Sequence, residues 1–379
     1  MKYPVFGLAA GLLVIGAGRA HAQGVTLPPS GDNQKASVSQ WIGLVKVDID
    51  YSSPDVTGPD GSDRTGHIYG EVVPYGLVNL GFGTCGDKCP WRAGANENTV
   101  FRVSHDVKIE GKKLPAGAYG LHMIPGEKRW TIIFSKNSTS WGSFFYDAKE
   151  DALRVSVEAR PHAYTHWLTY EFIDRQPAKA TVALRWENLE VPMTISVDNL
   201  PELYVANLRN ELRSAPGFDH QAWRNAAEYC LTNKTNLKEA LTWAKTAVDG
   251  PYVGTESFET LKTWSALLAV NGKKDEADKV IARALAHPTA TPIQIHTYGR
   301  ELLARGEKEA AVAVFEANAK KHPDTWPVNL GLARGYSTVG RMQDALRHAE
   351  LALKNAPDEP NRKNIEKMIE GLKAGKPAP

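Results

Sequence analysis

Hydrophobic and polar residues alternate along the first half of the chain, from Ser37 to about Val197. A period of two places successive side chains on opposite faces, as in half-buried β-strands. Turn signals such as Glu110-Gly111 and Pro125-Gly126 separate these runs, and no long helical pattern interrupts them. Short strands joined in this way predict an antiparallel β-sandwich or barrel. The expected strands are 37–42, 44–51, 98–103, 107–109, 117–124, 130–134, 153–158, 167–172, 181–186 and 193–197.

After Asp198 the hydrophobic pattern becomes helical and repeats. Gly272, Gly306 and Gly340 are spaced 34 residues apart, and Ala277, Ala311 and Ala345 follow in the same register. A constant period of this length indicates a solenoid in which each unit is one helix pair. The expected units are 221–254, 258–291, 292–325 and 326–359, followed by a capping helix over 361–372.

The repeat resembles the tetratricopeptide repeat. The small, aromatic and proline positions of that family match Gly299, Ala311, Phe315 and Pro323 in one unit, and the next unit matches at Tyr336, Ala345, Ala352 and Pro357. The resemblance implies stacked helix pairs with a groove for a protein or peptide partner. A structural appendage or a dimerisation surface is the alternative.

The first 22 residues have the pattern of a secretory signal peptide. Lys2 precedes an apolar run over residues 5–18, and Ala20-His21-Ala22 forms a small-x-small cleavage site. The apolar run is shorter than the roughly 20 residues that span a bilayer, so we expect a mature chain that begins at Gln23 and has no membrane span. The prediction is a periplasmic or secreted protein with a signal peptide (1–22), a β-sandwich domain (23–200) and a repeat domain (201–379).

The overall charge adds little to this picture. The chain has 45 Lys and Arg against 43 Asp and Glu, a formal net charge of +2. Removal of residues 1–22 takes away Lys2 and Arg19 but no acid, so the mature chain is formally neutral. A nucleic-acid partner is not expected, because phosphate binding requires a clustered basic surplus.

The β half contains a series of ordered motifs rich in aromatic residues, glycine and proline. They are Asp50-Tyr51 with Pro54, Val73-Pro74-Tyr75-Gly76, Trp91-Arg92-Ala93-Gly94-Ala95-Asn96-Glu97, Leu114-Pro115-Ala116-Gly117-Ala118-Tyr119, Ile124-Pro125-Gly126, Trp130-Thr131-Ile132-Ile133-Phe134, Trp141-Gly142, Tyr146-Asp147 and Trp167-Leu168-Thr169-Tyr170. With these motifs the chain resembles, over roughly residues 35–198, the secreted bacterial family known as domain of unknown function 2911. The insertion of residues 79–90 departs from the family pattern. The resemblance implies a fold and a compartment but no reaction.

Two cysteines four residues apart, Cys85 and Cys89, lie in a glycine-rich stretch. In an oxidising compartment such a pair can close a disulfide across a turn. The alternative is copper, because thiolates suit Cu(I) and a histidine can complete the site, the candidates being His122, His162 and His166. The Cys-x3-Cys-Pro string also resembles copper-delivery proteins of respiratory oxidase assembly, but their thioredoxin-like scaffold is not expected here. Apart from this alternative, no cofactor is predicted.

The polar cluster of Arg92, Asn96 and Glu97 is the main candidate for ligand binding. The planar guanidinium of arginine suits a carboxylate or sugar hydroxyls, and the amide and carboxylate can orient a polar ligand. The alternative is an Arg92–Glu97 ion pair that pins a loop. His122, Trp141 and Tyr146 are further ligand-binding candidates, the aromatic residues as the wall of a cleft for a small molecule or glycan.

Signatures of common enzymes are absent from the sequence. The chain has no G-x-S-x-G, H-E-x-x-H, phosphate-loop or dinucleotide-binding motif. The sequence therefore favours a binding or scaffolding protein, with a protein partner in the repeat groove and a small ligand or glycan in the β domain. A hydrolase of envelope polymers is the alternative, with Glu97, His122 and Asp147 as candidate catalytic residues.

Overall fold

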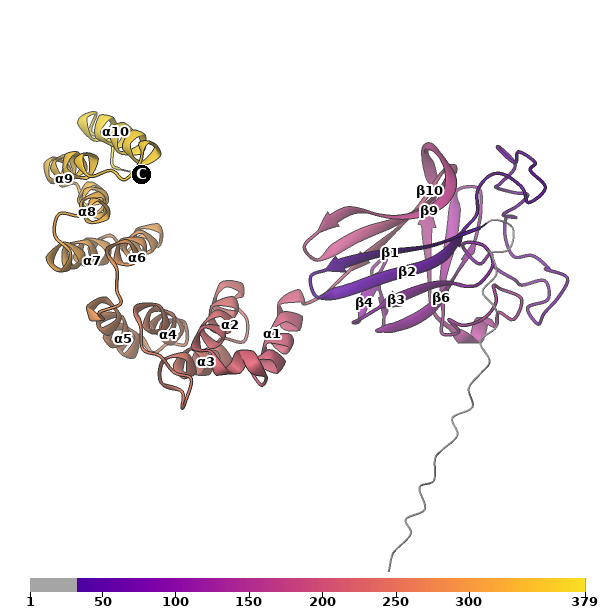
Figure 1. Cartoon of the computed structure of the whole chain (residues 1–379), viewed down its shortest axis with the longest axis horizontal. Helices are drawn as coiled ribbons and strands as arrows, with labels where there is room; N and C mark the ends of the chain where they lie inside the picture. Colours follow the sequence, from indigo (N-terminus) through magenta and orange to yellow (C-terminus); the bar gives the residue numbers. More distant parts are fainter. Residues whose placement is uncertain (1–32, 379) are drawn as a thin grey trace, which may run out of the picture. The chain divides into compact units, whose positions relative to one another are not determined.

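The computed structural model describes residues 33–378. The chain divides after Asp198 into a β unit and a helical unit, each compact in itself (Figure 1). The predicted signal peptide lies outside the described residues and stays a prediction.

The β unit consists of two antiparallel sheets. The six-stranded sheet has the order β1-β2-β3-β6-β7-β8, and the four-stranded sheet has the order β5-β4-β10-β9. The strands are β1 (Gln34–Ile42), β2 (Val45–Ser53), β3 (Thr99–Val103), β4 (Val107–Ile109), β5 (Lys112–Leu114), β6 (Gly117–Ile124), β7 (Arg129–Ser135), β8 (Asp151–Glu158), β9 (Arg160–Gln176) and β10 (Lys179–Ser196).

The two sheets pack face to face and do not close into a barrel. Burial alternates along β2, as the period of two predicts, and the inward side chains fill the space between the sheets. Along β6 and β7 consecutive residues are buried, so these strands are covered on both faces. The rings of Tyr51 on β2 and Tyr170 on β9 meet edge to face at 4.9 Å between centroids. Of the two predicted forms, the sandwich is therefore confirmed.

The departures from the predicted strands lie in the four-stranded sheet. The sequence does not predict β5, and it predicts only 167–172 of β9. At β10 it divides one strand in two. The sequence predicts separate strands at 181–186 and 193–197, whereas the structure has one strand across both. The register of β10 against β9 shifts around Glu187, which has a positive φ of 48°. This irregularity interrupts the alternation, and Glu190 is buried through ion pairs with Arg160 and Arg185. Polar residues inside the strand thus concealed its continuity.

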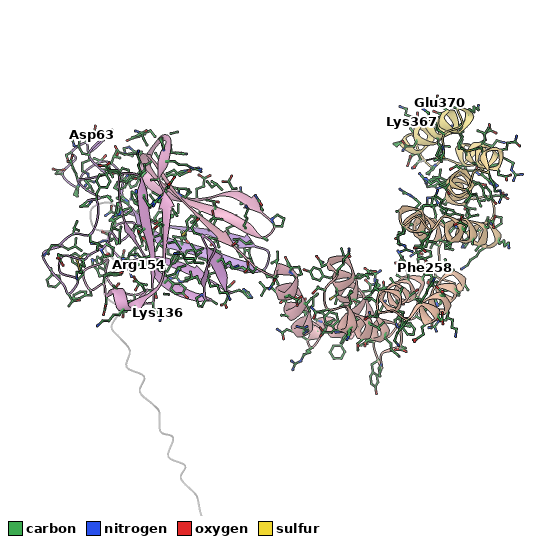
Figure 2. The ribbon with its side chains drawn as sticks, turned by 180° about the vertical axis from the view of Figure 1, so that it is seen from behind. Asp63, Lys136, Arg154, Phe258, Lys367 and Glu370 are labelled. Atoms are coloured by element: carbon green, nitrogen blue, oxygen red, sulfur yellow. A yellow bond between two sulfur atoms is a disulfide. The ribbon has the colours of Figure 1, made fainter. Side chains whose placement is uncertain are left out.

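A long connection without regular strands, residues 54–98, joins β2 to β3 and is fixed to the rest of the unit (Figure 2 labels Asp63 within it). Trp91 exchanges two backbone hydrogen bonds of 2.8 Å with Met123 on β6. The Tyr69 hydroxyl donates to the Trp186 carbonyl on β10 at 3.1 Å. Ala95 N–H donates to the Ser52 carbonyl at 2.9 Å. Hydrogen bonds to strands of both sheets therefore fix the position of this connection.

The helical unit consists of helix pairs in the predicted units, and Figure 2 marks Phe258 at the start of α4 and Lys367 and Glu370 on α10. Consecutive helices pack on one another except at the step from α5 to α6, and α2 contacts α4 while α6 contacts α8. The helices are α1 (Leu200–Glu211), α2 (His220–Asn233), α3 (Leu237–Asp249), α4 (Phe258–Val270), α5 (Lys274–Ala286), α6 (Pro292–Ala304), α7 (Lys308–Lys321), α8 (Trp326–Thr338), α9 (Met342–Lys354) and α10 (Glu359–Lys373).

Glycines explain both the turns and the close packing of these helices. Gly272, Gly306 and Gly340 have φ values of 79°, 82° and 82°, a left-handed conformation that ends a helix. Gly299 serves a different purpose, because a Cβ there would lie 2.3 Å from the Phe315 ring. The solenoid predicted from these positions is confirmed. Within residues 33–378, no helix has the length and apolar character needed to cross a bilayer.

Candidate functional site

The β unit contains a cavity of about 370 Å³ against the 54–98 connection. Its walls are partly apolar, with two tryptophans and four prolines, and partly polar. All the lining residues except three come from the connection. The lining is Pro54, Pro59, Arg64, Val72, Val73, Pro74, Gly76, Val78, Leu80, Pro90, Trp91, Arg92, Gly94, Ala95 and Asn96, together with Asn33, Ser143 and Trp186.

Arg92 enters the cavity wall next to the 142–144 segment. Its Nη1 donates to the Asn96 carbonyl at 2.5 Å, and its guanidinium carbon lies 5.2 Å from the centre of the Phe144 ring. Gly142 allows this approach, since a Cβ there would come within 2.5 Å of the guanidinium. Burial lowers the pKa of Arg92 below its usual value. The predicted Arg92–Glu97 ion pair is not present among the described residues.

Arg64 is the second arginine of the cavity. Its Nη2 donates to the Thr57 carbonyl at 2.9 Å. Its Nε is buried and has no hydrogen-bond partner within residues 33–378. Neither Arg64 nor Arg92 forms an ion pair with a described residue, and no Asp or Glu lines the cavity. The cavity therefore contains two positive charges with no counter-charge in its wall.

Behind the cavity wall, His122 and Ser143 form a buried pair. His122 Nδ1 and Ser143 Oγ are 2.8 Å apart, and each residue is 1% exposed. Burial, followed by the positive charge of Arg92, lowers the pKa of His122 to about 4, so the ring is neutral at pH 7. Ser143 lines the cavity, and His122, which does not, fixes the Ser143 side chain through this hydrogen bond.

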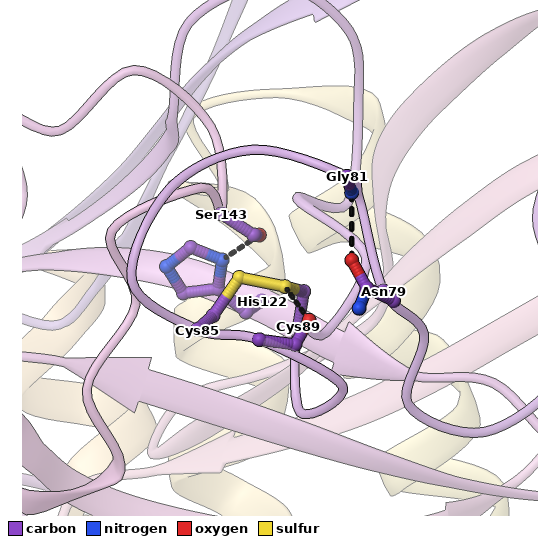
Figure 3. The surroundings of a disulfide bond; sticks show 7 residues. Asn79, Gly81, Cys85, Cys89, His122 and Ser143 are labelled. Carbon is purple, nitrogen blue, oxygen red and sulfur yellow. Dashed lines mark hydrogen bonds between the residues drawn. A yellow bond between two sulfur atoms is a disulfide. The ribbon is translucent and has the colours of Figure 1, made fainter.

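The cysteine pair lies beside this histidine (Figure 3). The sulfurs of Cys85 and Cys89 are at disulfide-bonding distance, with Cα atoms 5.2 Å apart, the pairing that the spacing predicts. The two residues pack with Ile133 and Tyr146 in a small apolar cluster. Thr84 N–H donates to the Phe144 carbonyl at 2.8 Å. The disulfide loop is thus attached to the segment that carries Ser143.

Glu97 and Asp147 lie outside this cavity. Glu97 lines a separate hollow and binds Lys35 and Ser52, each at 3.1 Å. Burial raises the pKa of Glu97, but hydrogen bonds from its own backbone and from these two residues outweigh it, and the net shift is downward. Asp147 caps a short helix by accepting a hydrogen bond from Lys149 N–H, and lines a third hollow. Glu97, Asp147 and His122 therefore do not converge.

The expected aromatic wall is also divided. Trp141 is 53% exposed and does not line the cavity. Tyr146 is buried, donates to the Asp151 carboxylate at 2.9 Å and accepts from Arg154 at 2.7 Å. These contacts fix the side chain of Tyr146, which lines the same separate hollow as Asp147, and burial raises its pKa. Of the predicted ligand-binding residues, Arg92 and Asn96 line the cavity.

The three histidines proposed for copper have other neighbours. His162 Nε2 lies 3.9 Å from Glu190, and His166 Nε2 lies 3.7 Å from Asp55, both on the β9 side of the unit. A disulfide leaves neither sulfur as a thiolate. Across residues 33–378, no group of three His, Cys, Asp or Glu side chains is placed to hold a metal ion.

Arg64 and Ser143 are site residues that sequence reasoning missed. Both belong to stretches without hydrophobic periodicity, where the pattern of alternation gives no direction for a side chain. One signal was available, because the connection between the strands predicted at 44–51 and 98–103 is far longer than an ordinary loop. Long structureless connections in compact domains are commonly functional.

The helical unit has two neighbouring arginines, Arg300 and Arg334, close to the buried His296. Arg334 Nη1 on α8 lies 3.2 Å from His296 Nε2 on α6. Burial and, to a smaller extent, the positive charge of Arg300 lower the pKa of Arg334 to about 10. Close by on α8, Ser337 Oγ accepts a hydrogen bond from Ala378 N–H at 3.0 Å. The non-helical C-terminal segment therefore returns to the helix that carries Arg334.

Comparison with family models bears out the resemblance of the β half. The model of a family described as "Protein of unknown function (DUF2911)" matches residues 33–195. A comparison with curated proteins finds no match.

Solved structures similar to this chain include tetratricopeptide-repeat proteins. YrrB, described as a TPR protein with an unusual peptide-binding site, is 18% identical over 45% of this chain and 84% of its own, with a TM-score of 0.29. PilW, described as a type IV pilus biogenesis factor, is 20% identical over 46% and 79%, with a TM-score of 0.32. PilF of Pseudomonas aeruginosa is 14% identical over 41% and 72%, with a TM-score of 0.29.

Proposed function

We propose that this chain is a binding protein of the cell envelope, in which the cavity of the β unit holds a small organic ligand. The cavity carries the proposal. Its volume of about 370 Å³ falls within the range of about 300–1,000 Å³ that is usual for small-molecule sites. Apolar walls with a few inward polar groups are the common composition of such sites.

Hydrogen bonds within the protein hold the walls in place, which supports a site that exists before binding. Backbone hydrogen bonds fix the connection to β6 through Trp91, and a side-chain bond fixes it to β10 through Tyr69. A ligand that enters a fixed cavity loses less free energy to ordering of the protein.

Ligand-detected NMR of the full mature chain with a fragment library tests this proposal. Val78 lines the cavity, whereas its neighbour Leu77 is 41% exposed and does not. We expect Val78→Phe to remove binding of the fragment hits and Leu77→Phe to leave it unchanged. Equal binding by both variants and the wild type would place the ligand site elsewhere.

The compartment is part of the proposal and rests on two features. The N-terminal residues have the signal-peptide pattern, with cleavage expected before Gln23. The Cys85–Cys89 pair fits an oxidising compartment. N-terminal sequencing of protein from the periplasmic or secreted fraction tests this, and a chain that retains residues 1–22 in the cytoplasm would contradict it.

A second proposed function is protein binding by the helical unit. The favouring observation is the pair of arginines Arg300 and Arg334 next to the buried His296, beside which a non-helical segment is bonded to α8 through Ser337 and Ala378. Burial and the two arginines lower the pKa of His296 to about 3, so only the arginines are charged. A partner segment with an acidic group suits such a surface. In a pull-down from envelope extract, Arg300→Glu should lose the partner and Lys279→Glu, on α5, should retain it. Identical partners with both variants would count against this function.

A further inference from the structure

The charges of the cavity are unbalanced within the β unit. Its lining contains two guanidinium groups, from Arg64 and Arg92, and no carboxylate. Elsewhere in the unit arginines do find acids, since Arg102 pairs with Asp50 and Arg160 with Glu190. Arg64 and Arg92 line the cavity and have no such ion pair with a described residue, and their hydrogen-bond acceptors are neutral backbone carbonyls.

Each of these arginines also has unused donors. An arginine carries five N–H donors. Arg64 uses Nη2 on the Thr57 carbonyl and leaves a buried Nε without a partner among the described residues. Arg92 uses Nη1 on the Asn96 carbonyl, and the Phe144 ring lies 5.2 Å from its guanidinium carbon. These contacts hold the two groups in place through neutral acceptors. The nearest acid with a resolved effect is Asp60, whose pKa is lowered by hydrogen bonds from Ser62 and, to a smaller extent, by the charge of Arg64; Asp60 does not line the cavity and forms no ion pair with Arg64.

A buried donor without an acceptor costs about 1–3 kcal/mol. A guanidinium in a partly desolvated cavity attracts an anion more strongly than one in open solvent, because the effective dielectric constant is lower. Carboxylate and phosphate oxygens match the fork of N–H groups and form shorter, stronger hydrogen bonds than neutral acceptors. The donors that line this cavity therefore match the oxygens of an oxyanion.

We infer that the ligand of the β-unit cavity is an organic oxyanion, a carboxylate or phosphate carried on an apolar body, with its charged group at Arg64 or Arg92 or bridging both. This inference rests on the proposed function and specifies the class of ligand. The apolar body packs against side chains of the same cavity, among them Val78, Leu80 and Trp91. Asn96 and Ser143 provide neutral polar groups in the wall.

Isothermal titration calorimetry of the full mature chain tests the inference with matched probes. The acids are benzoate, octanoate, indole-3-acetate and 1-naphthoate, and each is compared with its own amide. The pair of 1-naphthoate and 1-naphthyl phosphate separates carboxylate from phosphate preference. We expect at least one oxyanion to bind about tenfold or more tightly than the amide of the same body, the effect of about one charge-assisted hydrogen bond.

Variants then assign the preference to the two arginines. Arg64→Gln and Arg92→Gln should each weaken binding of the preferred oxyanion by about tenfold and leave the amide within about threefold. Arg102→Gln on β3, outside the cavity, is the matched control and should bind like the wild type. If Arg92→Gln fails to fold, Arg92→Lys, which keeps the charge but loses the fork, and Arg64→Gln still give the readout.

The outcomes distinguish failure of the oxyanion inference from failure of the proposed ligand-binding function. Equal affinity for acids and amides, or unchanged acid binding in both glutamine variants, would overturn the oxyanion inference and leave a ligand site intact. If no probe, charged or neutral, binds and the fragment library also gives no hit that depends on Val78, the proposed function fails with it.

Discussion

His122 has a pKa that depends on the folded structure. Its ring is 1% exposed, bonded to Ser143 and packed on Tyr146, with 5.3 Å between ring centroids. Burial and the nearby Arg92 lower its pKa to about 4, against about 6.5 for an exposed histidine. The sequence indicated a histidine on a sandwich strand but not its partner Ser143, which lies in a loop.

The low pKa of His122 predicts that acid destabilises the chain. As the pH falls, the unfolded state takes up the proton first, so the free energy of unfolding decreases from about pH 6.5 toward pH 4. The slope for this group is about 1.4 kcal/mol per pH unit. Chemical denaturation at several pH values should show a flatter slope for His122→Asn than for the wild type. Identical slopes would mean that His122 is not buried as a neutral ring.

Gly299 is a position where a packing contact requires glycine. Its missing Cβ makes room for the Phe315 ring, since an added Cβ would lie 2.3 Å away. We predict that Gly299→Ala lowers the free energy of unfolding by about 1–3 kcal/mol through overpacking. Gly371→Ala on α10 is the matched control, because a Cβ there has no atom within 4 Å. That variant should raise stability by up to about 1 kcal/mol through helix propensity. If thermal or chemical denaturation shows the same sign for both, the packing account is wrong.

At the scale of elements, periodicity predicted most of the fold but not the site. Regular alternation located the strands of the six-stranded sheet, and the 34-residue spacing located the helix pairs. Alternation did not locate β5 or the full length of β9, and it divided β10, where the bulge at Glu187 shifts the register. Residues 54–98 have no period. Because that connection provides most of the cavity lining, Arg92 and Asn96 could be identified from their chemistry, whereas their placement in a cavity could not.

The disulfide is the main covalent constraint on this connection. It closes a loop of five residues from Cys85 to Cys89, next to the hydrogen bond between Thr84 and Phe144. Loop-closure entropy for a loop this short predicts that Cys85→Ser with Cys89→Ser lowers the free energy of unfolding by about 2 kcal/mol. Denaturation with and without reductant checks this. Reductant should destabilise the wild type by a similar amount and leave the double variant unchanged. A wild type insensitive to reductant under unfolding conditions would contradict the bond.

At the scale of the whole molecule, the chain consists of two units that each have their own core. The helical unit has clusters around Phe315 and around Trp243, and the β unit is filled from its two sheets. We predict that residues 33–198 and residues 199–378, produced separately, each unfold in one cooperative transition. Circular dichroism during heating tests this, and a unit that is unfolded on its own would show that its core depends on the other.

The central claim is that the cavity of the β unit is a ligand site. The most direct measurement is a crystal structure of the mature chain grown with the tightest-binding acid from the calorimetric series. The account predicts the ligand inside the cavity lined by residues 54–98, with an acidic oxygen within hydrogen-bond distance of Arg64 or Arg92. A ligand bound elsewhere, or an empty cavity at a concentration far above the measured Kd, would contradict it.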